Sequence, residues 1–242
     1  MRLAAAAALL LSLAAAGLSA AGLPDPAPFD AVLAQRARSG GFDYRGTTGQ
    51  DRKRLAAYLA NLGDARPSAM TEGERKAFWI NAYNAWAIQT LLENPGKKIT
   101  EVPGAFDRAR HRVGGEMRTL DDVENRLRAM KDARIHFAIV CASRSCPPLA
   151  PAAYRAEGLA ESLDRQGRQF VNDPSRNIID RARGRIALSM IFKWNRKEFE
   201  RDGGTLLKFV ARYVSDPASS AWLAAATQEP EFLEYDWSPN QP

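Results

Sequence analysis

The chain has 242 residues, of which 45% are hydrophobic, and its 34 Lys and Arg against 28 Asp and Glu give a formal net charge of +6. This composition is typical of a globular protein, and after the N-terminus no hydrophobic stretch is long enough to cross a bilayer. The arginines are scattered rather than gathered into one stripe with aromatic residues, which disfavours nucleic acid as a partner. We expect a mature chain without stable membrane insertion.

Residues 1–21 have the pattern of a secretory signal peptide, with an early positive charge, a run of Ala and Leu, and small residues at the end. Cleavage is expected near Ala20 or Ala21, which predicts a periplasmic or secreted protein. Residues 22–28 would form a short tether. Residues 29–242 are expected to form a single globular domain, because no Gly/Ser-rich linker or charge block divides them.

Hydrophobic periodicity and capping signals predict a largely helical chain. Helices are expected at residues 29–38, 51–62, 71–92, 119–130, 158–171, 191–199, 205–214 and 218–226. Two of them open with the spacing of a capping box, at Thr71–Glu74 and Thr119–Asp122. Short strands are expected at 135–140 and 185–189, and residues 231–237 should be extended. The predicted fold class is α+β, a single domain with a small mixed or antiparallel sheet packed by several helices.

The stretch 134–149 concentrates the groups that could carry chemistry. It holds one of the two histidines, His136, and both cysteines, Cys141 and Cys146. Alternation along the predicted strand places His136 and Phe137 on opposite faces. The cysteines follow at the exit of the strand and in the next turn, where binding and catalytic groups tend to lie.

Three interpretations of the cysteines remain open. An exported protein with an even cysteine count favours a disulfide. Alternatively, a thiolate activated by His136 acts as a nucleophile. Zinc bound by His136, the two cysteines and His111 fits worst, because the spacing matches neither common paired motif, so no metal and no cofactor are expected. Redox exchange between the cysteines lacks the usual Cys-x-x-Cys spacing.

Three polar residues on predicted helices could support this stretch. Asn81 and Asn84 are three residues apart and share a helical face. A buried amide left unpaired costs about 1–3 kcal/mol, so each should tie down a nearby loop or serve a catalytic histidine. Glu124 lies at the edge of an apolar stripe, where it would either orient His136 or pair with an arginine such as Arg134.

Several common catalytic signatures are missing from the sequence. It contains no phosphate-cradling Gly-rich loop before Lys-Ser/Thr, no dinucleotide fingerprint, no His-Glu-x-x-His and no Gly-x-Ser-x-Gly. Nucleotide-driven work is therefore disfavoured.

Six ordered motifs together resemble the domain-of-unknown-function 547 family over roughly residues 70–240. They lie at residues 78–85, 114–124, 134–148, 172–177, 191–194 and 235–237. The resemblance implies site residues rather than a reaction, because the family is defined without an activity. Those residues are Asn81, Asn84, Glu124, His136, Cys141 and, as in bacterial-type members, Cys146. The chain departs from the family at Glu124-Asn125, where Glu-His is common.

The predicted function is that of an exported thiol hydrolase or acyltransferase acting on an envelope peptide or amide. Its catalytic residues would be Cys141, Cys146, His136, Glu124, Asn84 and Asn81. A cysteine would attack a carbonyl, His136 would move the proton, and Glu124 or Asn84 would orient the imidazole. Backbone amides of residues 142–146 would stabilise the oxyanion. The alternative is a disulfide-stabilised module that binds a small peptide or glycan in the cell envelope. The oligomeric state is left open.

Overall fold

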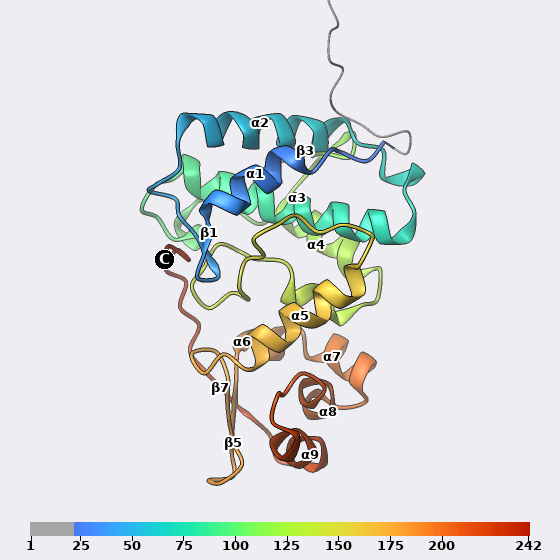
Figure 1. Cartoon of the computed structure of the whole chain (residues 1–242), viewed down its shortest axis with the longest axis vertical. Helices are drawn as coiled ribbons and strands as arrows, with labels where there is room; N and C mark the ends of the chain where they lie inside the picture. The colour runs from blue at the N-terminus through green and yellow to red at the C-terminus, as the bar shows by residue number, and fades with distance from the viewer. Residues whose placement is uncertain (1–21) are drawn as a thin grey trace, which may run out of the picture.

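The computed structural model describes residues 22–242, so the predicted signal peptide lies outside the described residues. The described helices are α1 (Ala27–Arg36), α2 (Gly49–Asp64), α3 (Glu72–Glu93), α4 (Leu120–Arg128), α5 (Leu159–Val171), α6 (Met190–Trp194), α7 (Arg196–Gly203), α8 (Leu206–Ala211) and α9 (Pro217–Ala225). Short 3-10 helices are η1 (Pro67–Ala69), η2 (Ile99–Glu101) and η3 (Ala133–Phe137). Helices α1 to α3 lie at one end of the long axis and α8 and α9 at the other (Figure 1).

The strands are short and form three small sheets. They are β1 (Ala37–Arg38), β2 (Gly41–Phe42), β3 (His111–Val113), β4 (Glu116–Arg118), β5 (Ile178–Asp180), β6 (Arg185–Leu188) and β7 (Glu231–Phe232). β1–β2 and β3–β4 are antiparallel pairs, whereas β6 pairs antiparallel with β5 and parallel with β7. This arrangement confirms the predicted α+β class.

Capping boxes define the first turns of α2, α3 and α4. Both boxes predicted from the sequence are present: the hydroxyls of Thr71 and Thr119 accept from the backbone N–H three residues later. Thr48 makes a third box with Asp51 at the start of α2, which the sequence analysis missed. Each box satisfies two amides that would otherwise lack partners in the first turn.

The buried side chains form two hydrophobic clusters that meet at η3. Ile135 packs in the first cluster, with α1 to α4 and the first half of α5, and Phe137 in the second, with the end of α5 and with α6 to α9. The ring of Phe137 contacts those of Phe170, Phe192, Phe199, Phe209 and Tyr213. Because Ile135 and Phe137, two residues apart on η3, enter different clusters, η3 joins the two halves of the molecule.

The strand predicted at 135–140 is wrong, because this segment is a 3-10 turn followed by irregular backbone. A short buried apolar run does not by itself distinguish a strand from a helical turn. Its backbone groups also have another partner: the Asn84 side chain donates to Ala138 O at 2.9 Å and accepts from Val140 N–H at 2.8 Å. The segment therefore needs no neighbouring strand.

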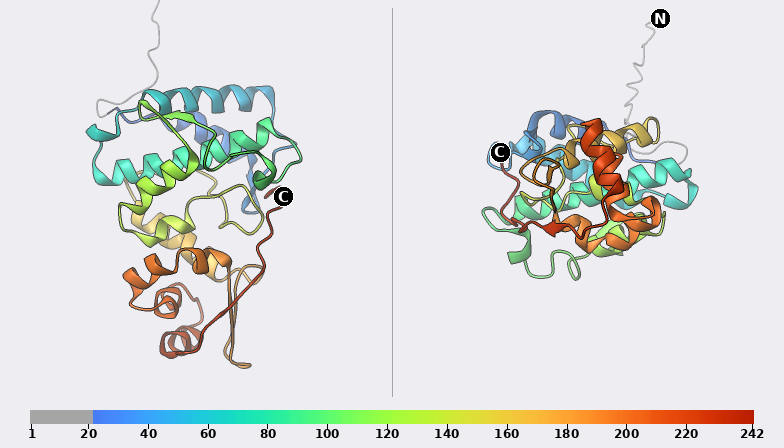
Figure 2. Two further views of the ribbon diagram at one scale, coloured as in Figure 1. Left: turned by 180° about the vertical axis from the view of Figure 1, so that it is seen from behind. Right: turned by 90° about the horizontal axis from the view of Figure 1, so that it is seen from below.

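Residues 235–240, here called the C-terminal strap, return from the far helices to the first half of the molecule (Figures 1 and 2). The Asn240 carbonyl accepts from Phe42 N–H, and Asn240 N–H donates to Ala142 O. Of the extended segment predicted at 231–237, only β7 pairs in a sheet.

The helix predicted at 191–199 is divided into α6 and α7. The break falls at Asn195, whose side chain donates back to Ile191 O at 3.0 Å. An asparagine side chain that caps a carbonyl in this way competes with continuation of the helix.

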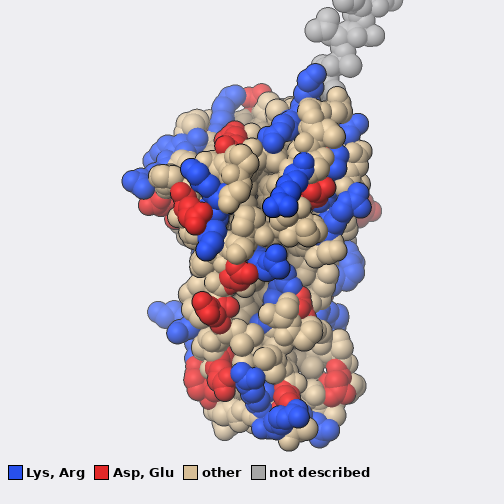
Figure 3. All heavy atoms as spheres, turned by 90° about the vertical axis from the view of Figure 1, so that its left-hand side faces the viewer, with Lys and Arg blue, Asp and Glu red and all other residues tan. Residues whose placement is uncertain are grey.

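Among the described residues, none of the helices combines the length and apolar character needed to span a bilayer. On the face shown in Figure 3, basic and acidic side chains are interspersed over the surface.

Candidate functional site

Cys141 and Cys146 are joined by a disulfide, and the turn between them lies against the C-terminal strap. The amides of Arg144 and Ser145 donate to carbonyls of the strap at 2.7 and 3.2 Å, and the Cys146 amide donates to Ser143 O at 3.1 Å. These three amides belong to the set predicted to stabilise an oxyanion. Because they are already bonded, that part of the prediction is corrected.

Two hydroxyl groups lie beside the sulfur atoms. The Tyr235 hydroxyl donates to Cys146 Sγ at 3.2 Å and lies 3.3 Å from Cys141 Sγ. Ser143 Oγ is 2.9 Å from Cys141 Sγ and 3.3 Å from Cys146 Sγ. Burial raises the pKa of Tyr235 to about 12, so this hydroxyl keeps its proton at neutral pH.

His136 is buried and pairs with a carboxylate that the sequence analysis did not select. Its Nε2 lies 2.9 Å from Glu198 Oε2. Because an ionised carboxylate only accepts, the Nε2 carries the proton of this bond. The described partner of the His136 ring is therefore Glu198, whereas the sequence led us to expect Glu124 or Asn84 in that place.

Arg128 links this pair to Glu124, the carboxylate that was predicted from the sequence. Its guanidinium binds Glu198 and also Glu124, whose Oε1 lies 2.6 Å from Nη2. The same Nη2 donates to Asn195 Oδ1 at 2.6 Å. Glu124 thus pairs with an arginine, as in the alternative weighed from the sequence, although the partner is Arg128 rather than Arg134.

The electrostatics of this cluster favour an ionised Glu198. Burial raises the pKa of its carboxyl, but the hydrogen bond from His136 and the charge of Arg128 outweigh burial and leave the pKa below its usual value. At Tyr83 the pKa is raised instead, because burial and the nearby charge of Glu124 both disfavour the ionised phenol. Glu198 is thus a stable acceptor for His136 at neutral pH.

Asn81 and Asn84 tie loops to α3. Asn84 holds residues 138–140, and Asn81 makes the same two-bond contact with Tyr154, donating to its carbonyl and accepting from its N–H, both at 2.8 Å. Each amide uses one donor and one acceptor on a single loop segment. These contacts match the loop-anchoring alternative rather than a contact with a catalytic histidine.

A cavity of about 200 Å³ brings four of the six predicted site residues together. Glu124, His136, Cys141 and Cys146 line it, whereas Asn81 and Asn84 do not. The remaining lining residues are Tyr83, Phe106, Arg128, Ile139, Ile191, Trp194, Asn195, Tyr235 and Trp237. The cavity therefore has a charged part around Arg128 and an aromatic part near the strap.

Three aromatic rings form a contiguous wall. The ring centroids of Trp194 and Tyr235 are 4.8 Å apart, and those of Tyr235 and Trp237 are 4.6 Å apart. Trp194 also stacks on Trp237 at 5.8 Å. Although it belongs to this cluster, Trp194 remains 47% exposed. A large ring left exposed beside a cavity is typical of a binding surface.

Arg128, Glu198 and Ser143 belong to this site but were not predicted from the sequence. Arg128 and Glu198 lie on different helices and meet only through tertiary packing, so no local spacing connects them. Motifs 191–194 and 235–237 did contain Trp194 and Tyr235, but nothing in the sequence placed them beside the cysteines.

His111 stands apart from this cavity, on β3, where its ring stacks on Trp86 at 4.1 Å. The zinc set that included it is therefore not assembled. Over residues 22–242, no group of three or more His, Cys, Asp or Glu is arranged to hold a metal ion.

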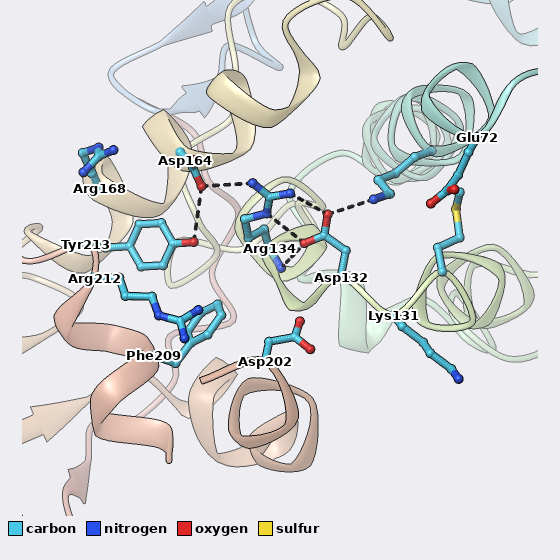
Figure 4. Close-up of a pocket in the computed structure, with 12 residues that line it drawn as sticks. Glu72, Lys131, Asp132, Arg134, Asp164, Arg168, Asp202, Phe209, Arg212 and Tyr213 are labelled. Atoms are coloured by element: carbon cyan, nitrogen blue, oxygen red, sulfur yellow. Dashed lines mark hydrogen bonds and ion pairs between the residues drawn. The ribbon is translucent and has the colours of Figure 1, made fainter. Parts of the chain in front are cut away.

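A second hollow of about 560 Å³ has a charged lining in which ions pair with one another (Figure 4). Asp132 binds Lys76 at 2.8 Å and Arg134 at 2.9 Å, and Arg134 continues to Asp164 at 3.2 Å. Burial opposes ionisation of Asp132, but these cations prevail and lower its pKa to about 2. The chain of ion pairs connects α3, η3 and α5, which indicates a structural brace.

The fold and the first cavity define a class: an α+β domain in which a disulfide, an aromatic wall and an ion-paired histidine face one cavity. Residues 67–171 match the model of the family described as "Protein of unknown function, DUF547". The resemblance expected from the sequence is thus confirmed over that segment, which contains all six predicted site residues. Its extension to about residue 240 stays a prediction. Neither a curated protein nor a solved structure matches the chain.

Proposed function

We propose that the protein is an exported binding module whose cavity takes one sugar ring of an envelope glycan. The observation that carries this proposal is the exposure of Trp194 within the aromatic wall. Burying a large apolar side chain stabilises a protein by about 1.5–3 kcal/mol, and Trp194 keeps much of its surface in water instead. A flat aromatic face complements the C–H face of a sugar ring.

The size and lining of the cavity support a small ligand. Its volume of about 200 Å³ lies below the roughly 300–1,000 Å³ of drug-sized ligand sites, so it suits one ring rather than an extended chain. The charged groups are paired with one another, Arg128 with Glu124 and Glu198. A neutral ring with hydroxyl or amide groups therefore fits better than a free ion.

Export is part of this proposal and has two supports. The first 21 residues have the composition of a signal peptide. The Cys141–Cys146 disulfide is a bond that persists in oxidising compartments.

The thiol hydrolase predicted from the sequence requires a different state of the same residues. A disulfide provides no thiolate, and the described hydrogen bond of the His136 ring goes to Glu198 rather than to a sulfur atom. Alkylation without reductant followed by intact-mass measurement separates the two functions. Two cysteines that remain unalkylated because they are disulfide-bonded favour the binding module, whereas alkylated free thiols would favour the hydrolase.

The binding proposal is tested by calorimetric titration of the oxidised protein with soluble oligosaccharides of N-acetylated amino sugars and with short peptides. Trp194→Ala should weaken glycan binding at least about tenfold, or about 1.4 kcal/mol. Met117→Ala is the matched control, because Met117 is the other large exposed apolar side chain of the described residues and lies on β4, outside the cavity lining. Binding of peptides alone, or equal effects of the two variants, would overturn the proposal.

A further inference from the structure

The two cysteines of the disulfide differ in their exposure to solvent. Both cysteines line the cavity, but Cys141 is half-buried and Cys146 is only 2% exposed. We propose that this disulfide is a thiol–disulfide exchange centre, in which Cys141 Sγ is attacked by a thiolate of a dithiol substrate and Cys146 Sγ is the leaving group. This activity goes beyond ligand binding and does not depend on it.

Cys146 Sγ is surrounded by groups suited to a leaving thiolate. The Cys141 N–H donates to it at 3.0 Å and the Tyr235 hydroxyl at 3.2 Å. Ser143 Oγ lies 3.3 Å away but is closer to Cys141 Sγ, at 2.9 Å. Hydrogen-bond donors placed where negative charge develops lower the barrier to its formation. Exchange is faster when the leaving thiol has a low pKa.

Arg176 anchors the turn that carries Cys146. Arg176 donates from Nε to Cys146 O at 2.8 Å and from Nη2 to Arg144 O at 3.0 Å. Its Nη1 is ion-paired with Asp173, so Arg176 holds the shape of the turn through these two carbonyls. Arg176 belongs to the motif 172–177, for which the binding proposal has no use.

The exchange balances as a two-electron transfer. A substrate thiolate forms a bond to Cys141 Sγ, the Cys141–Cys146 bond breaks, and its electron pair leaves on Cys146 Sγ. The second substrate thiolate then attacks the substrate sulfur of this mixed disulfide and releases Cys141 as a thiolate. The substrate dithiol is oxidised to a disulfide, its two protons pass to solvent or to the cysteines, and the protein is left as a dithiol.

The asymmetry is tested with single-cysteine variants and 5,5′-dithiobis(2-nitrobenzoate) as the probe. Cys146→Ser retains Cys141, the less buried cysteine, and should react at least about tenfold faster than Cys141→Ser, which retains the buried Cys146. The Cys146→Ser protein should also form a stable mixed disulfide with glutathione disulfide, visible by mass spectrometry. Equal rates for the two variants in native buffer would overturn the proposal.

The wild-type protein gives a test that does not rely on folding of the variants. Reduction of its disulfide by dithiothreitol, followed by alkylation and mass spectrometry, should be proportional to dithiothreitol concentration and unaffected by urea below the unfolding transition. A purely structural disulfide, reached only by unfolding, would instead show a rate that rises steeply with urea and saturates with reductant.

Tyr235→Phe tests the role of the Tyr235 hydroxyl as a hydrogen-bond donor to Cys146 Sγ. Loss of this hydrogen bond should slow reduction by dithiothreitol several-fold, up to about tenfold. Tyr44→Phe is the matched control, because the Tyr44 hydroxyl donates to Asn240 Oδ1 on the same strap at 2.9 Å without a described contact to sulfur. A rate equal to that of the control would show that Tyr235 only holds the strap, and would overturn its role in exchange.

Discussion

The carbonyl oxygen of Asn240 lies 1.9 Å from the point where a β-carbon on Gly41 would stand. The two residues are held together by the Phe42 N–H, which donates to this carbonyl at 2.9 Å. Glycine at position 41 is therefore what allows the C-terminal strap to reach β2.

Gly41→Ala should destabilise the protein by about 1–3 kcal/mol, because backbone atoms cannot move aside as a flexible side chain can. Urea unfolding measures the change. Gly49→Ala is the control: it lies at the start of α2 with no atom within 4 Å of its added β-carbon, so it should be neutral or slightly stabilising. Equal losses in both variants would contradict the close approach of the strap.

Asn84→Ala should cost about 2 kcal/mol or more, because it leaves Ala138 O and Val140 N–H buried without their partners. Hydrogen exchange should also show faster exchange of the Val140 amide. Gln89→Ala, on the same helix with an exposed hydrogen bond to Glu93, should change stability by less than about 0.5 kcal/mol. An unchanged Val140 exchange rate would show that another group holds the loop.

The helices were predictable because their signals are local. The capping boxes at Thr71 and Thr119 and the apolar stripes behind them depend on residues three or four positions apart. The segment 135–140 was not predictable in this way, since its backbone partner is an asparagine side chain more than 50 residues earlier in the sequence.

The same distinction between local signals and tertiary contacts applies to the residues of the candidate site. His136 and the cysteines stand out because the chain has so few residues of these types, and the cavity brings them together. Glu198 is one of many acidic residues, and only the packing of α7 against η3 places it at His136. The catalytic role predicted for the six site residues stays a prediction.

Asp132 should contribute stability that depends on pH. Its folded pKa of about 2 lies below the usual 3.8, so its contribution is full above about pH 4 and is lost as the pH falls towards 2. Allowing for solvent screening, Asp132→Asn should lower the free energy of unfolding at pH 7 by about 1–2 kcal/mol.

Urea titrations between pH 2 and pH 7 check this dependence. The curves of the wild type and Asp132→Asn should converge at the acid end. Asp107→Asn removes a solvent-exposed pair with Arg108 and should have little effect at any pH. A constant difference between wild type and Asp132→Asn down to pH 2 would contradict the assigned ion pairs.

Glu198→Gln should lower the thermal midpoint at pH 7 by about 2–4 °C, the change expected for roughly 1 kcal/mol in a protein of this size. The substitution keeps an oxygen acceptor for His136 but removes the charge that faces Arg128. Because the Glu198 pKa is depressed, its contribution should disappear as the pH falls below about 4.5 through the folded pKa.

Differential scanning calorimetry at several pH values measures this effect. Glu231→Gln is the control, since it breaks an exposed pair with Arg185. A thermal midpoint equally insensitive to both substitutions would show that the Glu198 cluster contributes nothing to stability.

The position of the C-terminal strap also determines when the cavity can form. A chain is made from its N-terminus, so α1 to α5 and both cysteines are complete before residues 235–240 exist. Until residues 235–240 have been synthesised, the turn between the cysteines lacks the strap carbonyls that accept from Arg144 and Ser145, and it lacks the hydroxyl of Tyr235. The turn between the cysteines is thus synthesised well before residues 235–240, which complete the wall around the two sulfur atoms.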